Sequence, residues 1–332
     1  MKHRKFFAPR LVALACISAS ALLVPTLVQA QAWKVQAWKV QVGVQTEDKA
    51  IQVLAYLPNE IWIHTGDSIE WTVATDEPHT VTFLTAGQVR PPYTVGCPGN
   101  APSGANEDGS GCVNSGVLAN GQGYSVTFPK PGNYKLVCLV HANMTSVVHV
   151  LDWSVPLPHY QDFYDDLAAD AKKGLASSSE HAMHPEDDSS ALSVSAGKGE
   201  IVATGGGSNT VSVMRFMHPD EVVHVGETVE WTNSDPVTPH TITFGAEPAN
   251  TMPPSANVTV DPDGARHATI SSPSDIVHSG FISASPQDRV GLAQTPAGVT
   301  RFRVTFTKAG VFQYKCVLHD NLGMLGEVTV QP

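Results

Sequence analysis

Two short stretches of the chain carry the same set of side chains that bind soft transition metals. In each stretch a cysteine is followed three residues later by a histidine and then by a methionine, and an isolated Pro-His pair lies upstream. The residues of the two sets are His79, Cys138, His141 and Met144 in the first half, and His240, Cys316, His319 and Met324 in the second. One thiolate, two imidazoles and one weak thioether suit a trigonal copper ion with a long axial bond, which serves electron transfer. The sequence therefore predicts two copper sites of this kind, called type 1 sites.

The two ligand sets lie in two copies of one sequence. Residues 51–71 align without gaps with residues 211–231, at a constant offset of 160, and the alignment ends on Trp71 and Trp231. Residues 128–138 align with residues 306–316 at an offset of 178, so the second copy holds 18 more residues between its first histidine and its cysteine. Such self-similarity indicates two domains of one fold.

The apolar residues of each copy alternate as they do in β-strands. In the first copy they occur at positions 61 and 63, 69 and 71, and 81 and 83, with turn-forming residues between these pairs. Two further runs of this kind flank the turn sequence Pro-Lys-Pro-Gly-Asn. Many short strands separated by turns predict an all-β protein of two β-sandwich domains, with Trp71 and Trp231 in the two cores.

The N-terminal thirty residues have the pattern of a secretory signal peptide. Four basic residues precede an apolar run from Leu11 to Val28, and small residues stand at the cleavage spacing before Ala30. A retained membrane anchor and lipidation at Cys16 are the alternatives. No later apolar run is long enough to span a bilayer, so we expect a periplasmic or secreted protein without an integral membrane segment after cleavage.

The remaining chain divides into two domains and a connecting segment. We expect the first domain over residues 31–155, the connection over residues 156–196 and the second domain over residues 197–332. Apolar residues four apart, early acidic residues and a late pair of lysines predict a short amphipathic helix within residues 156–174, ending at Gly174. A flexible, acidic linker is expected to follow, because residues 177–190 are polar and charged.

The net charge indicates which classes of partner the protein can bind, and the cysteine content indicates its compartment. The formal net charge is −11, and loss of the four basic residues of the signal peptide takes it to −15, which disfavours nucleic acid and favours basic patches on protein partners. Besides the two predicted ligands, Cys97 and Cys112 are the cysteines left after cleavage. In an oxidising compartment we expect them to form a disulfide.

The motifs around the two ligand sets resemble those of the cupredoxins, in particular the plastocyanin, pseudoazurin and amicyanin group. The resemblance covers nearly all of residues 45–152 and 200–332. It implies two Greek-key sandwiches, each with one type 1 copper ion. The family often places asparagine after the first histidine, whereas this chain has Thr80 and Thr241 there, and we expect their hydroxyl groups to support the cysteine loops instead.

The resemblance implies an electron carrier that exchanges electrons with redox partners such as cytochromes or copper- or quinone-linked oxidoreductases. We expect the electrons to pass through partly exposed His141 and His319. A multicopper oxidase or a copper nitrite reductase is the first alternative, but such enzymes carry a histidine beside the cysteine, and this chain has none at either site. Copper storage or tolerance is the second, and only His181 and His184 hint at the His-rich tracts that it commonly uses.

Overall fold

The computed structural model describes residues 34–93, 95–97, 99–183, 192–283 and 299–332, with no side chains for residues 175–183. The predicted signal peptide lies outside the described residues. The first copy contains β1 (Ala37–Gln45), β2 (Ile51–Leu57), β3 (Glu60–His64), β4 (Ser68–Val73), β5 (Thr82–Phe83), β6 (Ala105–Asn106), β7 (Val113–Asn114), β8 (Gly123–Thr127), β9 (Gly132–Val137) and β10 (Thr145–Leu151). The second copy contains β11 (Ser193–Thr204), β12 (Gly207–Met217), β13 (Asp220–His224), β14 (Thr228–Ser234), β15 (Thr243–Phe244), β16 (Thr259–Val260), β17 (Arg266–Ile270), β18 (Val277–His278), β19 (Arg301–Phe306), β20 (Gly310–Lys315), the 3-10 turn η2 (Asp320–Leu322) and β21 (Leu325–Gln331).

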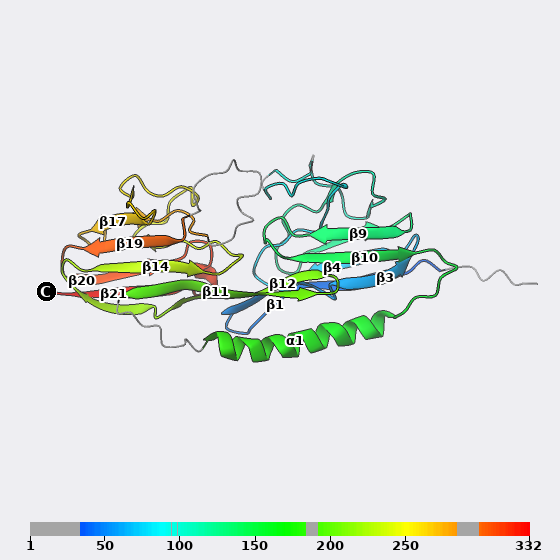
Figure 1. The fold of residues 1–332 in the computed structure, drawn as a ribbon, viewed down its shortest axis with the longest axis horizontal. Coiled ribbons are helices and arrows are strands. Elements are labelled where there is room, and N and C mark those ends of the chain that lie inside the picture. The colour runs from blue at the N-terminus through cyan, green and yellow to red at the C-terminus, as the bar shows by residue number, and fades with distance from the viewer. Residues whose placement is uncertain (1–33, 94, 98, 184–191, 284–298) are drawn as a thin grey trace, which may run out of the picture. The chain divides into compact units, whose positions relative to one another are not determined.

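The predicted all-β class and the two sandwiches are confirmed. Each copy has a five-stranded sheet of its own, in the order β3-β10-β9-β5-β7 in the first and β13-β21-β20-β15-β18 in the second. The other strands of both copies form one eleven-stranded sheet, in the order β16-β17-β19-β14-β11-β12-β2-β1-β4-β8-β6. Figure 1 shows β17, β19 and β14 of this sheet side by side. The strand order is therefore repeated from one copy to the next, except that β16 at one edge has no counterpart in the described part of the first copy.

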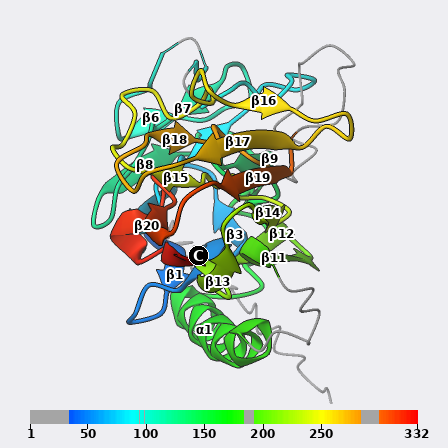
Figure 2. The same cartoon turned by 90° about the vertical axis from the view of Figure 1, so that its left-hand side faces the viewer.

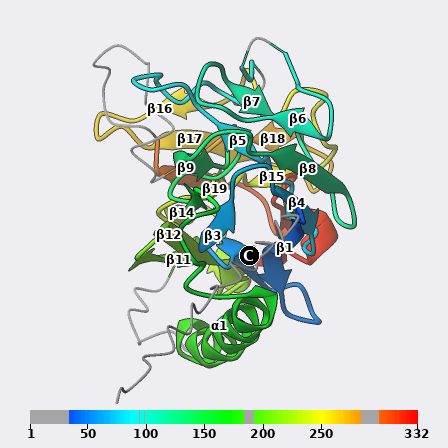
Figure 3. The ribbon, with the colours of Figure 1, turned by 90° about the vertical axis from the view of Figure 1, so that its right-hand side faces the viewer.

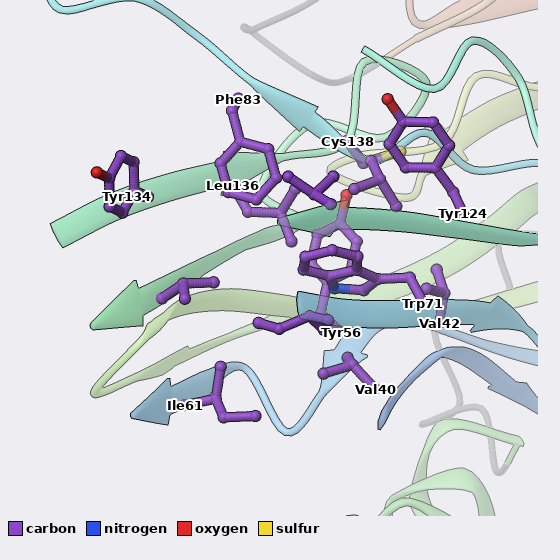
Figure 4. Packing of buried hydrophobic residues seen from close by; sticks show 14 of the residues in the cluster. Val40, Val42, Tyr56, Ile61, Trp71, Phe83, Tyr124, Tyr134, Leu136 and Cys138 are labelled. Carbon is purple, nitrogen blue, oxygen red and sulfur yellow. The ribbon is translucent and has the colours of Figure 1, made fainter. Parts of the chain in front are cut away.

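Aromatic side chains fill the core of each sandwich in the same way. Trp71 and Trp231 are almost fully buried, as predicted. The ring of Trp71 meets the ring of Phe83 edge-to-face at 5.8 Å, and Trp231 meets Phe244 at the same distance and in the same arrangement. Figure 4 shows the packed residues of the first core, in which Cys138 takes part. Each predicted ligand cysteine is thus held by a rigid apolar core.

The two copies meet through their equivalent strands β2 and β12, which pair antiparallel. Gln52 is paired with Ser212, and these two residues are 160 positions apart, the offset that aligns the copies. This one pair joins equivalent residues, and the pairs on either side of it are related as they are across the two-fold axis of a symmetric dimer.

Helix α1 (Gln161–Met183) connects the copies and is longer than the sequence suggested. The predicted stop at Gly174 was wrong, because the helix continues through it into the segment expected to be a linker. Ala168 and Ala171 of the helix pack on Val53, Ala55 and Leu57 of β2. In both end views α1 lies on one side and strands β6, β7 and β16 on the other (Figures 2 and 3).

Candidate metal centres

Each predicted set of ligands comes from one strand pair and one loop. In the first copy His79 exchanges two backbone hydrogen bonds with Leu118, while Cys138 directly follows β9 and Met144 directly precedes β10. A hydrogen bond from the amide of Cys138 to the carbonyl of Met144, 3.0 Å long, closes the loop that carries His141. The sheet therefore fixes both ends of this loop.

The second copy repeats this arrangement with a longer loop. His240 exchanges backbone hydrogen bonds with Ile282, and the amide of Cys316 donates to the carbonyl of Met324 at 3.1 Å. Four residues separate His319 from Met324, two more than in the first copy, and three of them form η2, which begins after His319. The different spacing seen in the sequence thus becomes an added turn, and the loop is closed in the same way.

The donor atoms of each set converge on one point. In the first copy Nδ1 of His79 lies 3.2 Å from Nδ1 of His141, and Sγ of Cys138 lies 4.0 Å and 3.9 Å from these two atoms. Every one of these side chains is almost fully buried. The structure therefore brings together three donors that are 59 and 3 residues apart in the sequence.

The second cluster has nearly the same geometry. Nδ1 of His240 lies 3.1 Å from Nδ1 of His319, and Sγ of Cys316 lies 3.9 Å and 3.4 Å from them. Met144 and Met324 are both fully buried next to their cysteines in the respective cores. The two histidines and the cysteine of each predicted set thus form one cluster in each copy, and the backbone hydrogen bond to the cysteine holds the methionine at the end of the same loop.

The separations suit one metal ion in each cluster. Zinc, a first-row ion, binds histidine nitrogen at about 2.0–2.1 Å and cysteine sulfur at about 2.3 Å, so donors around such an ion lie roughly 3–4 Å apart. The Nε2 atoms of His79 and His240 are buried without a hydrogen-bond partner in the described parts of the chain, while their Nδ1 atoms face the clusters. A thiolate combined with two imidazoles favours copper among such ions.

The electrostatics of the first cluster favour the thiolate. Burial disfavours ionisation of Cys138, but hydrogen bonds with His141 and His79 outweigh it and hold the pKa of the thiol well below its usual range. Burial likewise opposes the charged form of His141, whereas Cys138 and Glu77 favour it and raise its pKa to about 9. Burial lowers the pKa of His79 and of His319. The apo cluster thus resembles a thiolate–imidazolium pair, from which a metal ion would displace the proton.

Thr80 and Thr241 support the cysteine loops, as the sequence predicted. The Thr80 hydroxyl accepts a hydrogen bond from the amide of Leu139 at 2.8 Å, and the Thr80 amide donates to Sγ of Cys138 at 3.4 Å. Thr241 makes the equivalent contacts in the second copy, accepting from Val317 at 2.9 Å and donating to Cys316 at 3.3 Å. Each threonine therefore holds the residue after the cysteine and stabilises negative charge on the sulfur.

Two glycines at the clusters were missed by the sequence analysis. Gly43 and Gly197 lie at the irregularities of β1 and β11, with φ angles of +73° and +75°. A Cβ atom on Gly197 would lie 2.2 Å from Nε2 of His240, and one on Gly43 would lie 3.0 Å from Nε2 of His79. A lone glycine inside an alternating strand was the available signal, since it marks a bulge or a close backbone approach.

The expectation that His141 and His319 are partly exposed was wrong. They are 2% and 4% exposed, because the face of each copy that carries them is covered by the other copy. Val237 of the second copy packs within the core cluster of the first. Val140 and Leu318, which precede the two histidines, pack against the cores of their own copies.

Glu77, which the sequence analysis did not single out, lies between the clusters. One carboxylate oxygen is hydrogen-bonded to Nε2 of His141 at 3.2 Å, and the other lies 3.5 Å from Nε2 of His319. Burial opposes the charge of this carboxylate, but His319 and His141 outweigh burial and lower its pKa to about 2. Its place immediately before Pro78 was the only signal in the sequence.

A cavity of about 730 Å³ lies next to the first cluster. Cys138, His141 and Met144 contribute to its lining, together with the basic residues Arg90 and Lys135. Arg90 also donates hydrogen bonds to the carbonyl groups of Cys138 and Leu139. The wall of this cavity is therefore tied directly to the cysteine loop.

Cys97 and Cys112 form the predicted disulfide, in the long connection between β5 and β7. The side chains of His181 and His184 lie outside the described parts of the structure. None of the described helices is both long enough and apolar enough to cross a membrane.

Comparisons with known proteins give a family and several structural relatives. A reduced variant of amicyanin is 21% identical, with 35% of this chain and 82% of that chain aligned and a TM-score of 0.24. Amicyanin from Paracoccus versutus is 22% identical over 35% of this chain and 81% of its own, with a TM-score of 0.24. No curated protein sequence matches the chain significantly. The profile of the copper-binding plastocyanin/azurin family matches residues 40–151 and again residues 201–331. The chain therefore belongs to the plastocyanin/azurin family of copper-binding proteins, of which it contains two tandem domains.

Proposed function

We propose that the chain is an exported electron-transfer protein that holds one type 1 copper ion in each domain. The observation that carries this proposal is the pair of buried His-Cys-His clusters, each with a methionine beside its cysteine. Copper bound there would supply a one-electron couple. The residues present would bind it through Nδ1 of two histidines and through a thiolate, while the core excludes water and the closed loops limit movement.

The burial of the two histidines changes the route by which a partner would approach. Neither imidazole edge is accessible, so we place the approach of a redox partner to the first domain at the cavity beside Cys138 and Met144. Among the described residues, Arg90 and Lys135 line that cavity together with no acidic side chain, so it suits an acidic or apolar group of the partner. The acidic net charge of the chain as a whole favours basic patches elsewhere on the partner, which we propose to be a cytochrome or a copper- or quinone-linked oxidoreductase. A periplasmic or secreted location follows from the predicted signal peptide and the disulfide.

Copper analysis and single cysteine variants test the proposal. The purified protein should bind two copper ions per chain and show intense blue absorption. Cys138→Ser should remove the contribution of the first domain and leave that of the second, and Cys316→Ser should do the reverse. Replacement of both Cys97 and Cys112 by serine is the matched control, in which both contributions should remain. Colourless, readily exchanged copper in the unmodified protein would contradict electron transfer and favour storage.

A multicopper enzyme is the competing function, and it differs in the number of metal ions. Val137 and Leu139 flank Cys138, and Lys315 and Val317 flank Cys316, so neither cysteine has the neighbouring histidine that links a blue site to a catalytic one. Electron paramagnetic resonance separates the two functions. A third copper ion per chain that gives a type 2 signal would contradict the electron-carrier function and support an enzyme.

A further inference from the structure

The carboxylate of Glu77 is the feature that joins the two clusters. Glu77 is 4% exposed and belongs to the first copy, yet its two oxygens are directed at ligand histidines of both copies. Taking a carboxylate out of water is costly unless it is paired. Its side-chain partners among the described residues are these two imidazoles. The pairing with both clusters therefore compensates for the burial of the charge.

The pairing of equivalent strands explains how one carboxylate reaches both sites. Because β2 and β12 are related by an approximate two-fold axis, the histidine loops of the two copies approach the same region from opposite sides. Glu77, which bridges His141 and His319, has no symmetric counterpart in the second copy. The residue before Pro239 is Thr238, whose hydroxyl group is near Ser212 instead. A single glutamate, supplied by the first copy, thus contacts a ligand histidine of each copy.

The atoms in contact also define the state of each imidazole. A carboxylate that accepts a hydrogen from Nε2 leaves the lone pair of Nδ1 directed at the metal position, and such partners orient the ring. Glu77 does this for His141 at 3.2 Å and is placed to do it for His319 at 3.5 Å. Because both rings share that carboxylate, a movement of one imidazole changes the hydrogen bonding of the other.

We propose that Glu77 couples the two metal centres, so that the chain works as one two-electron unit with direct exchange between its sites. The inference rests on the proposed function. The exchange moves one electron from the reduced centre to the oxidised one, and the chain gains or loses no proton in the process. His141, Glu77 and His319 form a polar connection between the clusters, and all three side chains are almost fully buried.

The first test examines the metal-free protein. Glu77→Gln removes the charge and keeps the size of the side chain, while Glu107→Gln is the matched control at the other buried glutamate of the first copy. With nitrogen-15 in histidine, nuclear magnetic resonance should show changed Nε2 signals for both His141 and His319 in Glu77→Gln, and unchanged signals in Glu107→Gln. A change at His141 alone would overturn the coupling and leave Glu77 as a positioning residue of one site.

The second test measures electron exchange after copper loading. Rapid reduction by a flash-generated donor should be followed by a step whose rate does not depend on protein concentration. Glu77→Gln should slow that step by about tenfold to a hundredfold, the usual effect of removing an outer partner of a metal ligand. An unchanged rate would overturn the proposal. If the unmodified protein lacks blue copper, the proposed function fails, while the first test still reports on the bridge.

Glu77→Asp covers the case in which the glutamine variant does not fold. Aspartate keeps the charge but is one methylene group shorter, so it cannot span both imidazoles. One of the two histidine signals should then change, and the exchange step should slow. Retention of both signals and of the rate would overturn the proposal.

Discussion

Replacement of Gly197 by alanine is expected to damage the second metal centre and to leave the first intact. Gly197 has a φ angle of +75° at the irregularity of β11, and its Cα faces the imidazole of His240. A Cβ atom would lie 2.2 Å from Nε2 and 2.8 Å from Cδ2 of that ring. The ring is enclosed by the core, so it has little room to withdraw.

The size of the effect follows from these distances. Ordinary van der Waals contact begins at 3.4 Å, so the ring must shift by about 1.2 Å, and a misplacement on the order of 1 Å typically costs about a hundredfold in function at a preorganised site. We therefore expect the copper affinity of the second centre to fall by about a hundredfold. The left-handed backbone adds about 1–2 kcal/mol of destabilisation.

Gly264→Ala provides the control, because Gly264 also has a positive φ angle, of +85°, but a Cβ there would meet nothing within 4 Å. Both variants lose stability through the backbone, whereas only Gly197→Ala should lose one equivalent of tightly bound copper and half of the blue absorption. Metal analysis, visible spectroscopy and urea unfolding measure these quantities. Two tightly bound copper ions with an unchanged spectrum in Gly197→Ala would refute the reasoning.

Three further predictions concern the free energy of unfolding. Burial raises the pKa of Glu107 from 4.5 to about 7, so the native state binds its proton more tightly than the unfolded state. The free energy of unfolding should therefore fall as the pH rises from about 4.5 through 7, by up to about 3 kcal/mol from this group, and Glu107→Gln should remove that part of the pH dependence in urea titrations. Thr80→Val should cost about 1–3 kcal/mol, because the buried amide of Leu139 loses its acceptor, whereas Thr80→Ser should retain most of the stability in the same assay. Replacement of Cys97 and Cys112 by serine should lower the free energy of unfolding by roughly 3 kcal/mol, seen as a lower thermal midpoint.

The features that depend on local sequence or on ligand chemistry could be predicted. Alternating apolar residues identified β3, β4 and β5, because a strand with one buried face imposes a period of two. The residue types needed to bind copper identified two donor sets, and the structure brings the histidines and cysteine of each set together. The disulfide followed from the compartment and from the two cysteines left over.

The features that depend on contacts between distant segments could not be predicted. Residues 124–128 and 134–138 flank one turn sequence, and β8 pairs with β4 whereas β9 pairs with β10, so the turn connects strands of two different sheets. The sequence on either side of the turn does not indicate these partners. The burial of His141 and His319 depends on how the two copies pack, and no pattern within one copy records it. Glu77 acquires its partners only through that packing, so its residue type carried no information.

The pairing of β2 with β12 also has a consequence for the first copy on its own. An unpaired edge strand offers a row of free N–H and C=O groups to other chains and promotes aggregation. In the complete chain the two strands cover each other, and the polar side chains Gln52, Thr210 and Ser212 are buried at the seam. β1 covers one edge of β2, and β12 covers the other, so a first copy without the second would expose one edge of β2 to other chains.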